Sequence, residues 1–428
     1  MKLRAILLIL SISIAFTGCI TEEADIFSAS PIDRLNKAMS ENAALLQSAE
    51  NGWAMEYFAT SQSRGYTLFA KFSKSGKVVF SSNSDLTNNV IASDSSVYDV
   101  IGDAGPVLTF NTYNKVLHAF SNPENPNGSG LEGDYEFVVI SKSADLITLK
   151  GKKRGTTILM HRIPASVSWS QYMAETELVN STLFANGAPA LTMSLSDDYK
   201  FSGGGSHIFS ILRFGAEPKT AESASFIVTR TGIRFHSVQN LDGKSFQTFT
   251  LNSQKSALIC DEDPSLSFVG PDSLASYFAT NSINEWVFNS SKMSSSVKAT
   301  YDILVQSLTT KYKATNIQLS VKYDATRKTP VFKISFKENV TTKKQTLIGN
   351  IDFGFSATAK MAVTLTQKDT QDSNGAKFIT SIVGYKEMAD LIATSFTLTT
   401  ETPINPQTLH FVKATDANVS FTLLSSVN

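Results

Sequence analysis

The sequence predicts a mainly β protein of the α+β type, with two or three antiparallel β-meander units that form barrels or sandwiches, each preceded by a helix. Short runs rich in aromatic and β-branched residues recur along the 428 residues, separated by turn-forming residues such as Ser63, Ser73 and Gly76. Before or between these groups of runs lie three stretches with helical spacing of apolar residues, at 31–50, 169–184 and 297–308.

The first unit is predicted over residues 31–165. Ser30 can cap a helix over 31–50, and Pro31 suits the first turn of that helix. The short connections that follow are typical of an antiparallel meander that curls into a barrel or sandwich. Its strands are expected at 52–60, 65–72, 77–82, 106–110, 115–120, 135–141, 146–150 and 156–161.

The second unit is predicted over residues 166–275, where a helix over 169–184 comes first. Its strands are expected at 191–195, 207–214, 225–229, 233–237, 246–251 and 257–260.

The third unit is predicted over residues 276–428. Its helix at 297–308 has Val297, Tyr301 and Leu304 on one face. A short helix is expected at 386–393. Strands are expected at 317–323, 331–336, 346–355, 359–366, 378–383, 395–399, 408–411 and 418–424.

The first residues have the pattern of a secretory signal peptide. Lys2 and Arg4 lie just before an almost wholly apolar run over residues 5–16. That run is shorter than the about 20 residues that a helix needs to span a bilayer. We therefore expect residues 1–18 to be a signal peptide that is removed.

Cys19 is expected to be the lipidated first residue of the mature chain. The small residues Thr17 and Gly18 precede it, in a pattern that resembles the lipobox of bacterial lipoproteins. In that chemistry the thiol receives diacylglycerol and the new amine is acylated, and more than one acyl chain anchors a protein stably. The alternative is an ordinary secretory signal with an incidental cysteine.

Residues 19–30 are predicted to be a flexible tether. The acidic residues Glu22, Glu23 and Asp25 follow the anchor closely. This run resembles the export signal that sends lipoproteins of Bacteroidetes-type bacteria to the outer face of the outer membrane. We therefore expect the protein to be exposed on the cell surface and held to the outer membrane by the lipid on Cys19. The alternative is the periplasmic face, with the acidic residues only keeping the linker extended.

Composition limits the classes of partner. Without the signal peptide the chain has 410 residues, 36 basic and 38 acidic, so its net charge is −2. No global field attracts nucleic acid, and we expect no nucleic-acid partner. If Cys19 is lipidated, Cys260 is the one remaining cysteine, so no intramolecular disulfide can form and the fold must rest on its cores.

Several motifs of the first unit carry a family resemblance. They include ENGWAMEY at 50–57, GPVLTFNTYN at 105–114, GDYEF at 133–137 and LKGKK at 149–153. Over roughly residues 30–165 the chain resembles an uncharacterised family of Bacteroidetes lipoproteins, the domain of unknown function 4302. The resemblance implies a surface lipoprotein, often encoded near outer-membrane uptake components and a predicted metallopeptidase. It implies no catalytic or ligand-binding residue.

The ligand-binding candidates are His118, Asn114 and Asp134, which all lie in or beside the resembling motifs. The alternative is that His118 is held by a hydrogen bond in a turn. No two of the five histidines have the His-x-x-x-His spacing, so no metal site is predicted and no cofactor is expected.

Two further stretches resemble functional sites in part. Residues 122–134 have spacings that suit a calcium loop in part, but Pro123 stands at the first ligand position, so a surface turn is the better interpretation. Gly203 to His207 places a serine beside a histidine without the Gly-x-Ser-x-Gly elbow, and it is interpreted as a hairpin connection. No catalytic residue is predicted.

The leading functional hypothesis is a non-catalytic surface lipoprotein that is a binding or accessory component of an outer-membrane nutrient-uptake system. The chain is accordingly not expected to be an enzyme. A hydrolase assembled from distant residues is the second hypothesis, and a structural or adhesive surface protein is the third. A concave pocket favours binding, a cluster of carboxylates or histidines with shifted pKa favours a hydrolase, and flat β-faces favour adhesion.

Overall fold

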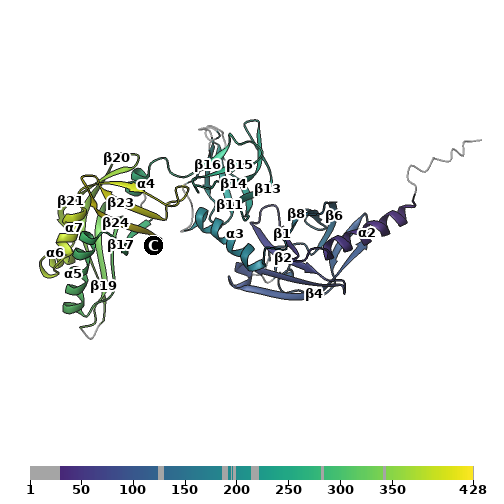
Figure 1. Ribbon diagram of the computed structural model, residues 1–428, viewed down its shortest axis with the longest axis horizontal. Coiled ribbons are helices and arrows are strands. Elements are labelled where there is room, and N and C mark those ends of the chain that lie inside the picture. The colour runs from purple at the N-terminus through teal and green to yellow at the C-terminus, as the bar shows by residue number, and fades with distance from the viewer. Residues whose placement is uncertain are drawn as a thin grey trace, which may run out of the picture.

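Three β units lie in a row in the computed structural model (Figure 1). The structure describes residues 29–123, 130–185, 191–193, 195, 199–213, 221–280, 284–340 and 344–427. Within these residues it has a closed eight-stranded barrel, an eight-stranded sheet, a second closed eight-stranded barrel and six α-helices. We call the three units the N-terminal barrel, the middle sheet and the C-terminal barrel. The predicted mainly β fold of antiparallel units is confirmed.

The N-terminal barrel follows helix α2 (Pro31–Gln47), which Ser30 caps by accepting the backbone N–H of Asp33 at 3.2 Å. Pairing of β1 with both β2 and β8 closes the barrel. Its strands are β1 (Trp53–Phe58), β2 (Gly65–Phe72), β3 (Lys77–Asn83), β4 (Ile91–Gly102), β5 (Pro106–Phe110), β6 (Glu136–Lys142), β7 (Leu146–Gly151) and β8 (Thr157–Arg162), with short 3₁₀ helices η1 (Asp85–Thr87) and η2 (His118–Phe120).

Strand β1 is buried on both of its faces. Trp53, Met55 and Tyr57 belong to the barrel core. The alternation of a strand therefore turns Glu56 and Phe58 outward, and these side chains are buried as well. The outward face is covered because helix α3 and the middle sheet pack against it, and this packing creates the cleft described below.

The middle sheet begins with helix α3 (Trp169–Phe184), which Ser168 caps by accepting the backbone N–H of Gln171 at 3.1 Å. Its core consists largely of stacked and edge-on phenylalanine rings, such as Phe209 against Phe226. The strands are β9 (Thr192–Met193), β10 (Tyr199–Gly203), β11 (Ile208–Arg213), β12 (Ala221–Val228), β13 (Gly232–Leu241), β14 (Lys244–Leu251), β15 (Ala257–Cys260) and β16 (Ser267–Val269).

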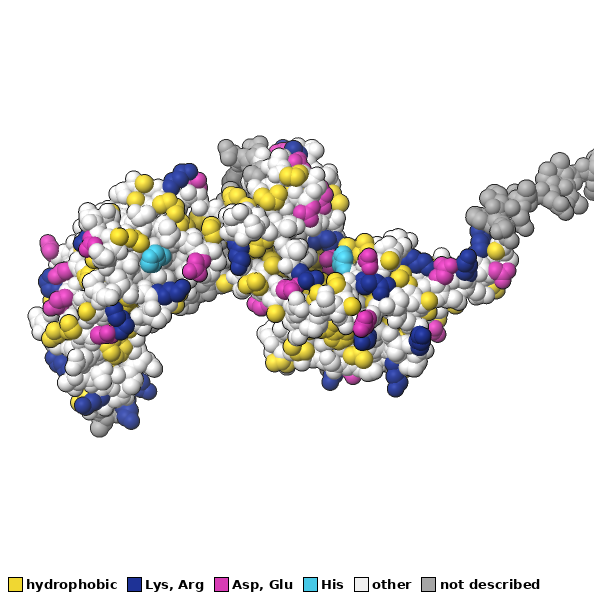
Figure 2. Space-filling view, viewed as in Figure 1, with side chains coloured by type: hydrophobic (Ala, Val, Ile, Leu, Met, Phe, Trp, Pro, Cys, Tyr) yellow, Lys and Arg dark blue, Asp and Glu magenta, His cyan; other side chains and the backbone are white. Residues whose placement is uncertain are grey.

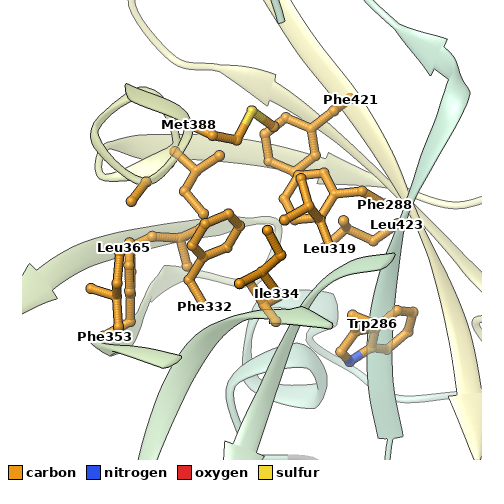
Figure 3. Packing of buried hydrophobic residues seen from close by; sticks show 14 of the residues in the cluster. Trp286, Phe288, Leu319, Phe332, Ile334, Phe353, Leu365, Met388, Phe421 and Leu423 are labelled. Carbon is orange, nitrogen blue, oxygen red and sulfur yellow. The ribbon is translucent and has the colours of Figure 1, made fainter. Parts of the chain in front are cut away.

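The C-terminal barrel is closed by pairing of its first and last strands, β17 and β24. Figure 3 shows Met388 of helix α7 reaching the same buried cluster as Phe332 and Phe421. Its elements are α4 (Leu274–Thr280), β17 (Asn284–Met293), α5 (Ser295–Tyr312), β18 (Thr315–Asp324), β19 (Thr329–Lys337), β20 (Thr346–Ala359), β21 (Ala362–Gln371), α6 (Ser373–Ser381), α7 (Tyr385–Ile392), β22 (Ser395–Thr399), β23 (Thr408–Lys413) and β24 (Asp416–Val427).

The loop between β22 and β23 attaches the C-terminal barrel to the middle sheet. Ile404 is fully buried in the core of the middle sheet. Next to it, Nδ2 of Asn405 donates to the carbonyl oxygen of Leu183 at 2.9 Å. A loop from one unit therefore completes the core of another.

Two predicted strands are wrong. Residues 115–120 form a turn and η2, because the side chain of Asn114 accepts the backbone N–H groups of Val116 and Leu117. Residues 378–381 are the last turn of helix α6, and residues 382–383 follow it. The N-cap of this helix, Asp372, accepts the backbone N–H of Gly375 at 2.5 Å. Local side-chain capping decided both segments.

Four strands were not predicted: β4, β10, β16 and β17. Strand β4 contains Ser93, Asp94, Ser95 and Ser96, a cluster that is typical of loops. Two neighbouring strands, β3 and β5, pair with β4 and so hold it extended.

Among the described residues, no helix combines the length and the apolar character that crossing a bilayer would require.

Candidate functional site

Asn114 and Asp134, two of the predicted ligand-binding residues, are buried and hold backbone turns. Asn114 donates from Nδ2 to the hydroxyl of Ser96 at 3.2 Å. The carboxylate of Asp134 accepts the backbone N–H groups of Lys153 at 2.9 Å and Arg154 at 2.8 Å. These contacts account for both side chains structurally.

His118, the third candidate, lies in the turn after Asn114. Its Nδ1 accepts the backbone N–H of Asn114 at 3.0 Å. Its ring lies between the rings of Tyr113 and Tyr135, with centroids 5.1 and 5.0 Å away. Burial lowers the pKa of His118. None of the three candidates lines the cleft described below.

Two other predictions fall on residues that the structure does not describe. Cys19 and the rest of residues 1–28 lie outside the described part of the chain, as do residues 124–129 of the stretch weighed as a calcium loop. Lipidation of Cys19 therefore stays a prediction.

A cleft of about 550 Å³ lies between the N-terminal barrel and the middle sheet, with helix α3 along one side. It is lined by the start of β2, the turn after β3, the C-terminal half of α3 and the middle sheet around β12. Its volume is within the range of about 300–1,000 Å³ that is usual for small-molecule pockets. We take it as the candidate functional site.

Two of the three charged side chains that line the cleft pair with each other, and the third, Glu177, has no ion-pair partner among the described residues. The guanidinium of Arg64 forms an ion pair with the carboxylate of Asp85, and it lies 4.8 Å from the ring centroid of Tyr66. Glu177 on α3 accepts a hydrogen bond from Nδ2 of Asn180 at 3.4 Å. The cleft is therefore polar without offering an uncompensated cation among its described lining residues.

His207 lies on the opposite wall in a left-handed backbone conformation, with φ 60°. Gly204 shapes the turn before it: its φ is 92°, and a Cβ there would lie 2.7 Å from Phe209. Nε2 of His207 is 3.0 Å from Oδ1 of Asn180. Burial, together with the nearby charge of Arg64, lowers the pKa of His207 to about 4, so this ring is neutral at pH 7.

The turn after β3 presents Ser84 to the cleft. The carbonyl oxygen of Ser84 accepts the backbone N–H groups of Thr87 at 3.0 Å and Asn89 at 2.7 Å. The residue is only 9% exposed, and its buried hydroxyl has no hydrogen-bond partner within the described part of the chain. A buried polar group without a partner is unusual and calls for an explanation.

Apolar side chains form the rest of the lining. They come from both units and from α3: Tyr66, Phe69, Met173, Phe184, Ile227 and Val228. Apolar walls with a few convergent polar groups are typical of small-molecule sites.

A buried ion pair joins the two units beside the cleft. Glu56 of β1 pairs with Arg234 of β13, and Nε2 of His161 lies 3.2 Å from the other carboxylate oxygen of Glu56. Burial alone would raise the pKa of Glu56, but the hydrogen bonds and charges of His161 and Arg234 outweigh it and hold that pKa below its usual value. Next to this ion pair, Nη2 of Arg230 lies 2.5 Å from Oε2 of Glu175.

A second, more open cleft of about 480 Å³ lies on the C-terminal barrel. Lys292 and Glu401 face each other there at 3.6 Å, and both side chains are exposed. His410 in the same cleft is 3.1 Å from the hydroxyl of Thr422. This cleft has no unpaired buried polar group among its described lining residues.

Neither metal nor thiol chemistry is indicated by the described residues. No group of three or more His, Cys, Asp or Glu side chains in them could hold a metal ion. Cys260 is buried, and burial raises the pKa of its thiol, which makes the thiolate scarcer at pH 7.

The family comparison covers the whole cleft. Residues 23–253 match the model of the family described as Domain of unknown function (DUF4302). The chain belongs to this family. Every residue that lines the cleft between the N-terminal barrel and the middle sheet lies inside the matched range, whereas the C-terminal barrel lies outside it.

Similarity to solved structures is low. An uncharacterized protein from Bacteroides eggerthii DSM 20697 is 15% identical, with a TM-score of 0.18 and coverage of 26% of this chain and 96% of that chain. A mutant of the vaccine antigen Transferrin Binding Protein B (TbpB) from Haemophilus parasuis Hp5 is 9% identical, with a TM-score of 0.11 and coverage of 85% of this chain and 66% of that chain. Comparison with curated proteins gives no match.

The residues that make the cleft were not identified from the sequence. Arg64, Ser84 and His207 come from three separate turns, and no motif connects them. One signal was present: three consecutive glycines, Gly203 to Gly205, precede His207. Such a run marks backbone that must bend sharply or approach another group closely.

Proposed function

We propose that this DUF4302 protein is a non-catalytic lipoprotein, anchored through Cys19 in the outer membrane with its folded part on the cell surface, where it binds a nutrient for an uptake system. The cleft between the N-terminal barrel and the middle sheet carries the proposal. It combines the volume, the apolar walls and the convergent polar groups of a small-molecule site. An adhesive protein with flat β-faces would not require such a cleft.

The placement of helix α2 fits an anchored protein. This helix begins at the end of the molecule that is far from the C-terminal barrel (Figure 1). Residue 29 comes ten positions after Cys19, and at most about 3.5 Å each these positions could span roughly 35 Å. With the anchor at Cys19, the N-terminal barrel would stand near the bilayer and the C-terminal barrel would project from it.

The chemistry of the cleft favours binding over hydrolysis. A general base works best with a pKa near the working pH, whereas His207 has a pKa of about 4. The Asp85 carboxylate is held by Arg64. These groups are suited to forming hydrogen bonds with a ligand rather than to transferring its protons.

The surface also fits a neutral cargo. On the face shown in Figure 2, Lys and Arg side chains are interspersed with Asp and Glu side chains. Mixed charges do not produce the strong field of one sign that steers nucleic acids or highly charged ligands.

The anchor is tested by replacing each cysteine. Cys19→Ala is expected to move the protein from the membrane fraction to the soluble fraction, while the matched control Cys260→Ala leaves it with the membrane. Protease added to intact cells should degrade the wild-type chain. A wild-type chain that resists protease until the cells are lysed contradicts surface exposure.

A further inference from the structure

We propose that the junction between the N-terminal barrel and the middle sheet is a hinge that opens in acid, with His236 of β13 as its trigger. The inference goes beyond the proposed function, because it concerns the movement of two units and requires no ligand. It is carried by the contacts between β1 and β13 and by the histidines beside them. Because both units line the cleft, opening would also separate its walls.

Two pairs of side chains join the units, from the facing sides of two strands. Phe235 belongs to the core of the middle sheet, so the alternation of a strand turns Arg234 and His236 outward from β13. Opposite them, Glu56 and Phe58 point outward from β1. Arg234 pairs with Glu56. The ring of His236 lies against Phe58, with centroids 4.9 Å apart and an interplanar angle of 72°.

Helix α3 is shared by both units and so provides a pivot. Its first turn packs on the barrel, where Trp169 stacks on Phe69 with centroids 5.5 Å apart. Its last turn is buried in the core of the middle sheet through Leu183 and Phe184. Figure 1 shows α3 running from the middle sheet to the barrel. None of the hydrophobic clusters of described residues contains side chains of both β1 and β13, so this contact can separate while α3 keeps the units joined.

Protonation of His236 disfavours the closed junction. Its Nε2 is buried and has no hydrogen-bond partner among the described residues. Burial, together with the nearby charge of Arg234, lowers the pKa of His236. When the junction opens, water reaches the ring and its pKa returns toward the ordinary 6.5. The open form therefore binds more protons than the closed form, and acid favours it.

His161 of β8 offers Glu56 a second partner inside the barrel. Its Nε2 lies 3.2 Å from one carboxylate oxygen of Glu56, while Arg234 bonds the other oxygen. A protonated His161 balances the charge of Glu56 without help from the middle sheet. The carboxylate then keeps a counter-charge when Arg234 moves away, which lowers the cost of breaking the buried ion pair.

Other charged groups at the junction keep α3 on the middle sheet or act in the same direction as His236. Arg230 of the middle sheet pairs with Glu175 of α3. His207 and Arg64 line the cleft from the middle sheet and the barrel. Burial and the charge of Arg64 lower the pKa of His207 to about 4, although Asp85 acts against them. Protonation of His207 therefore adds a repulsion between the units at lower pH.

The test measures a distance across the junction. Spin labels are attached at Ser95→Cys on β4 and Ser245→Cys on β14, two exposed positions on different units. The mature chain also carries Cys19→Ala and Cys260→Ala, so the introduced cysteines are the only ones. Pulsed dipolar spectroscopy is expected to show one distance at pH about 7 and a second, longer distance at pH about 5, the range in which histidines ordinarily titrate. Circular dichroism should show unchanged β structure.

Three variants identify the trigger. His236→Gln keeps a polar side chain that cannot be protonated, so the ratio of the longer to the shorter distance at pH about 5 should fall by roughly ten-fold. His161→Gln removes the alternative partner of Glu56 and should lower the same ratio. His410→Gln is the matched control, because His410 lies on β23 of the C-terminal barrel, and its ratio should equal that of the wild-type protein.

The outcomes separate a hinge from unfolding. A single unchanged distance down to the pH at which the chain unfolds overturns the hinge, as does a longer distance that appears only with loss of the β signal. The same ratio in His236→Gln as in the wild-type protein overturns the trigger. If His236→Gln does not fold, equal ratios in His161→Gln and His410→Gln overturn the role of the histidines. Because no ligand is added, each of these results leaves the proposed function standing.

Discussion

At the scale of single residues, the junction of the two family-matched units depends on Glu56 and Arg234. Both residues are only 8% exposed, and they are 178 positions apart in the sequence. Taking two charges out of water is costly, and their attraction offsets this only when both partners are present. Removing one partner alone therefore leaves a buried charge without its counter-charge.

Glu56→Gln is expected to destabilise the protein by about 3–5 kcal/mol, because it leaves the guanidinium of Arg234 buried without its counter-charge. Urea denaturation measures this loss. Glu132→Gln is the control, since Glu132 forms an exposed pair with Arg154 and should change stability by less than about 1 kcal/mol. Equal losses in the two variants would show that the pair is not effectively buried.

The stability of the junction is expected to fall in acid. His207 has a pKa of about 4 in the folded protein against 6.5 for an ordinary histidine, so between these values the unfolded chain binds more protons. Stability is therefore lost as the pH falls from about 6.5 to 4. The lowered pKa of Glu56 acts in the same direction at lower pH.

Melting temperatures recorded across this pH range test the assignment. His207→Asn tolerates the left-handed backbone and removes the titrating ring. Its melting temperature should fall less steeply between pH 6.5 and 4 than that of the wild-type protein. Identical slopes would mean that His207 is not the group responsible.

At the scale of elements, the start of α2 and the aromatic strands of the N-terminal barrel were predictable, whereas the polar strand β4 was not. Ser30 and Pro31 marked the start of α2, and the aromatic runs of β1 and β2 identified the N-terminal barrel. Strand β4 stays extended only because β3 and β5 pair with it. Such pairing between distant segments leaves no local signal in the sequence.

The cleft was unpredictable for the same reason. Its polar residues lie in turns, where serine, asparagine and aspartate are common for local reasons. Nothing in the sequence distinguishes Ser84, whose hydroxyl lacks a partner among the described residues, from Ser63, whose hydroxyl donates to the carbonyl oxygen of Thr60. The difference comes from the packing of the middle sheet against the barrel.

Gly270→Ala tests the attachment of the C-terminal barrel. A Cβ at position 270 would collide with the backbone carbonyl of Pro403, in the loop that carries Ile404 into the middle sheet. We expect a loss of about 1–3 kcal/mol, typical of overpacking, measured by calorimetry. Gly105→Ala is the control, because none of the described residues lies within 4 Å of its added Cβ. A Gly270→Ala protein as stable as the control would contradict the close approach.

At the scale of the whole molecule, two of the three β units form the candidate site and the third is attached to one of them. The N-terminal barrel and the middle sheet, which lie in or overlap the family-matched residues 23–253, enclose the cleft. The C-terminal barrel is joined to the middle sheet by the loop that carries Ile404. This arrangement places the candidate site between helix α2 at one end of the molecule and the C-terminal barrel at the other (Figure 1).

Hydrogen–deuterium exchange of the mature chain, with and without panels of short oligosaccharides and short peptides, tests most directly whether the cleft binds a small molecule. Exchange is expected to slow in the segments that line the cleft, residues 64–69, 83–89, 173–184, 205–207 and 227–228. Unchanged exchange throughout, or slowing confined to residues 292–294 and 399–401 of the C-terminal barrel, would contradict it.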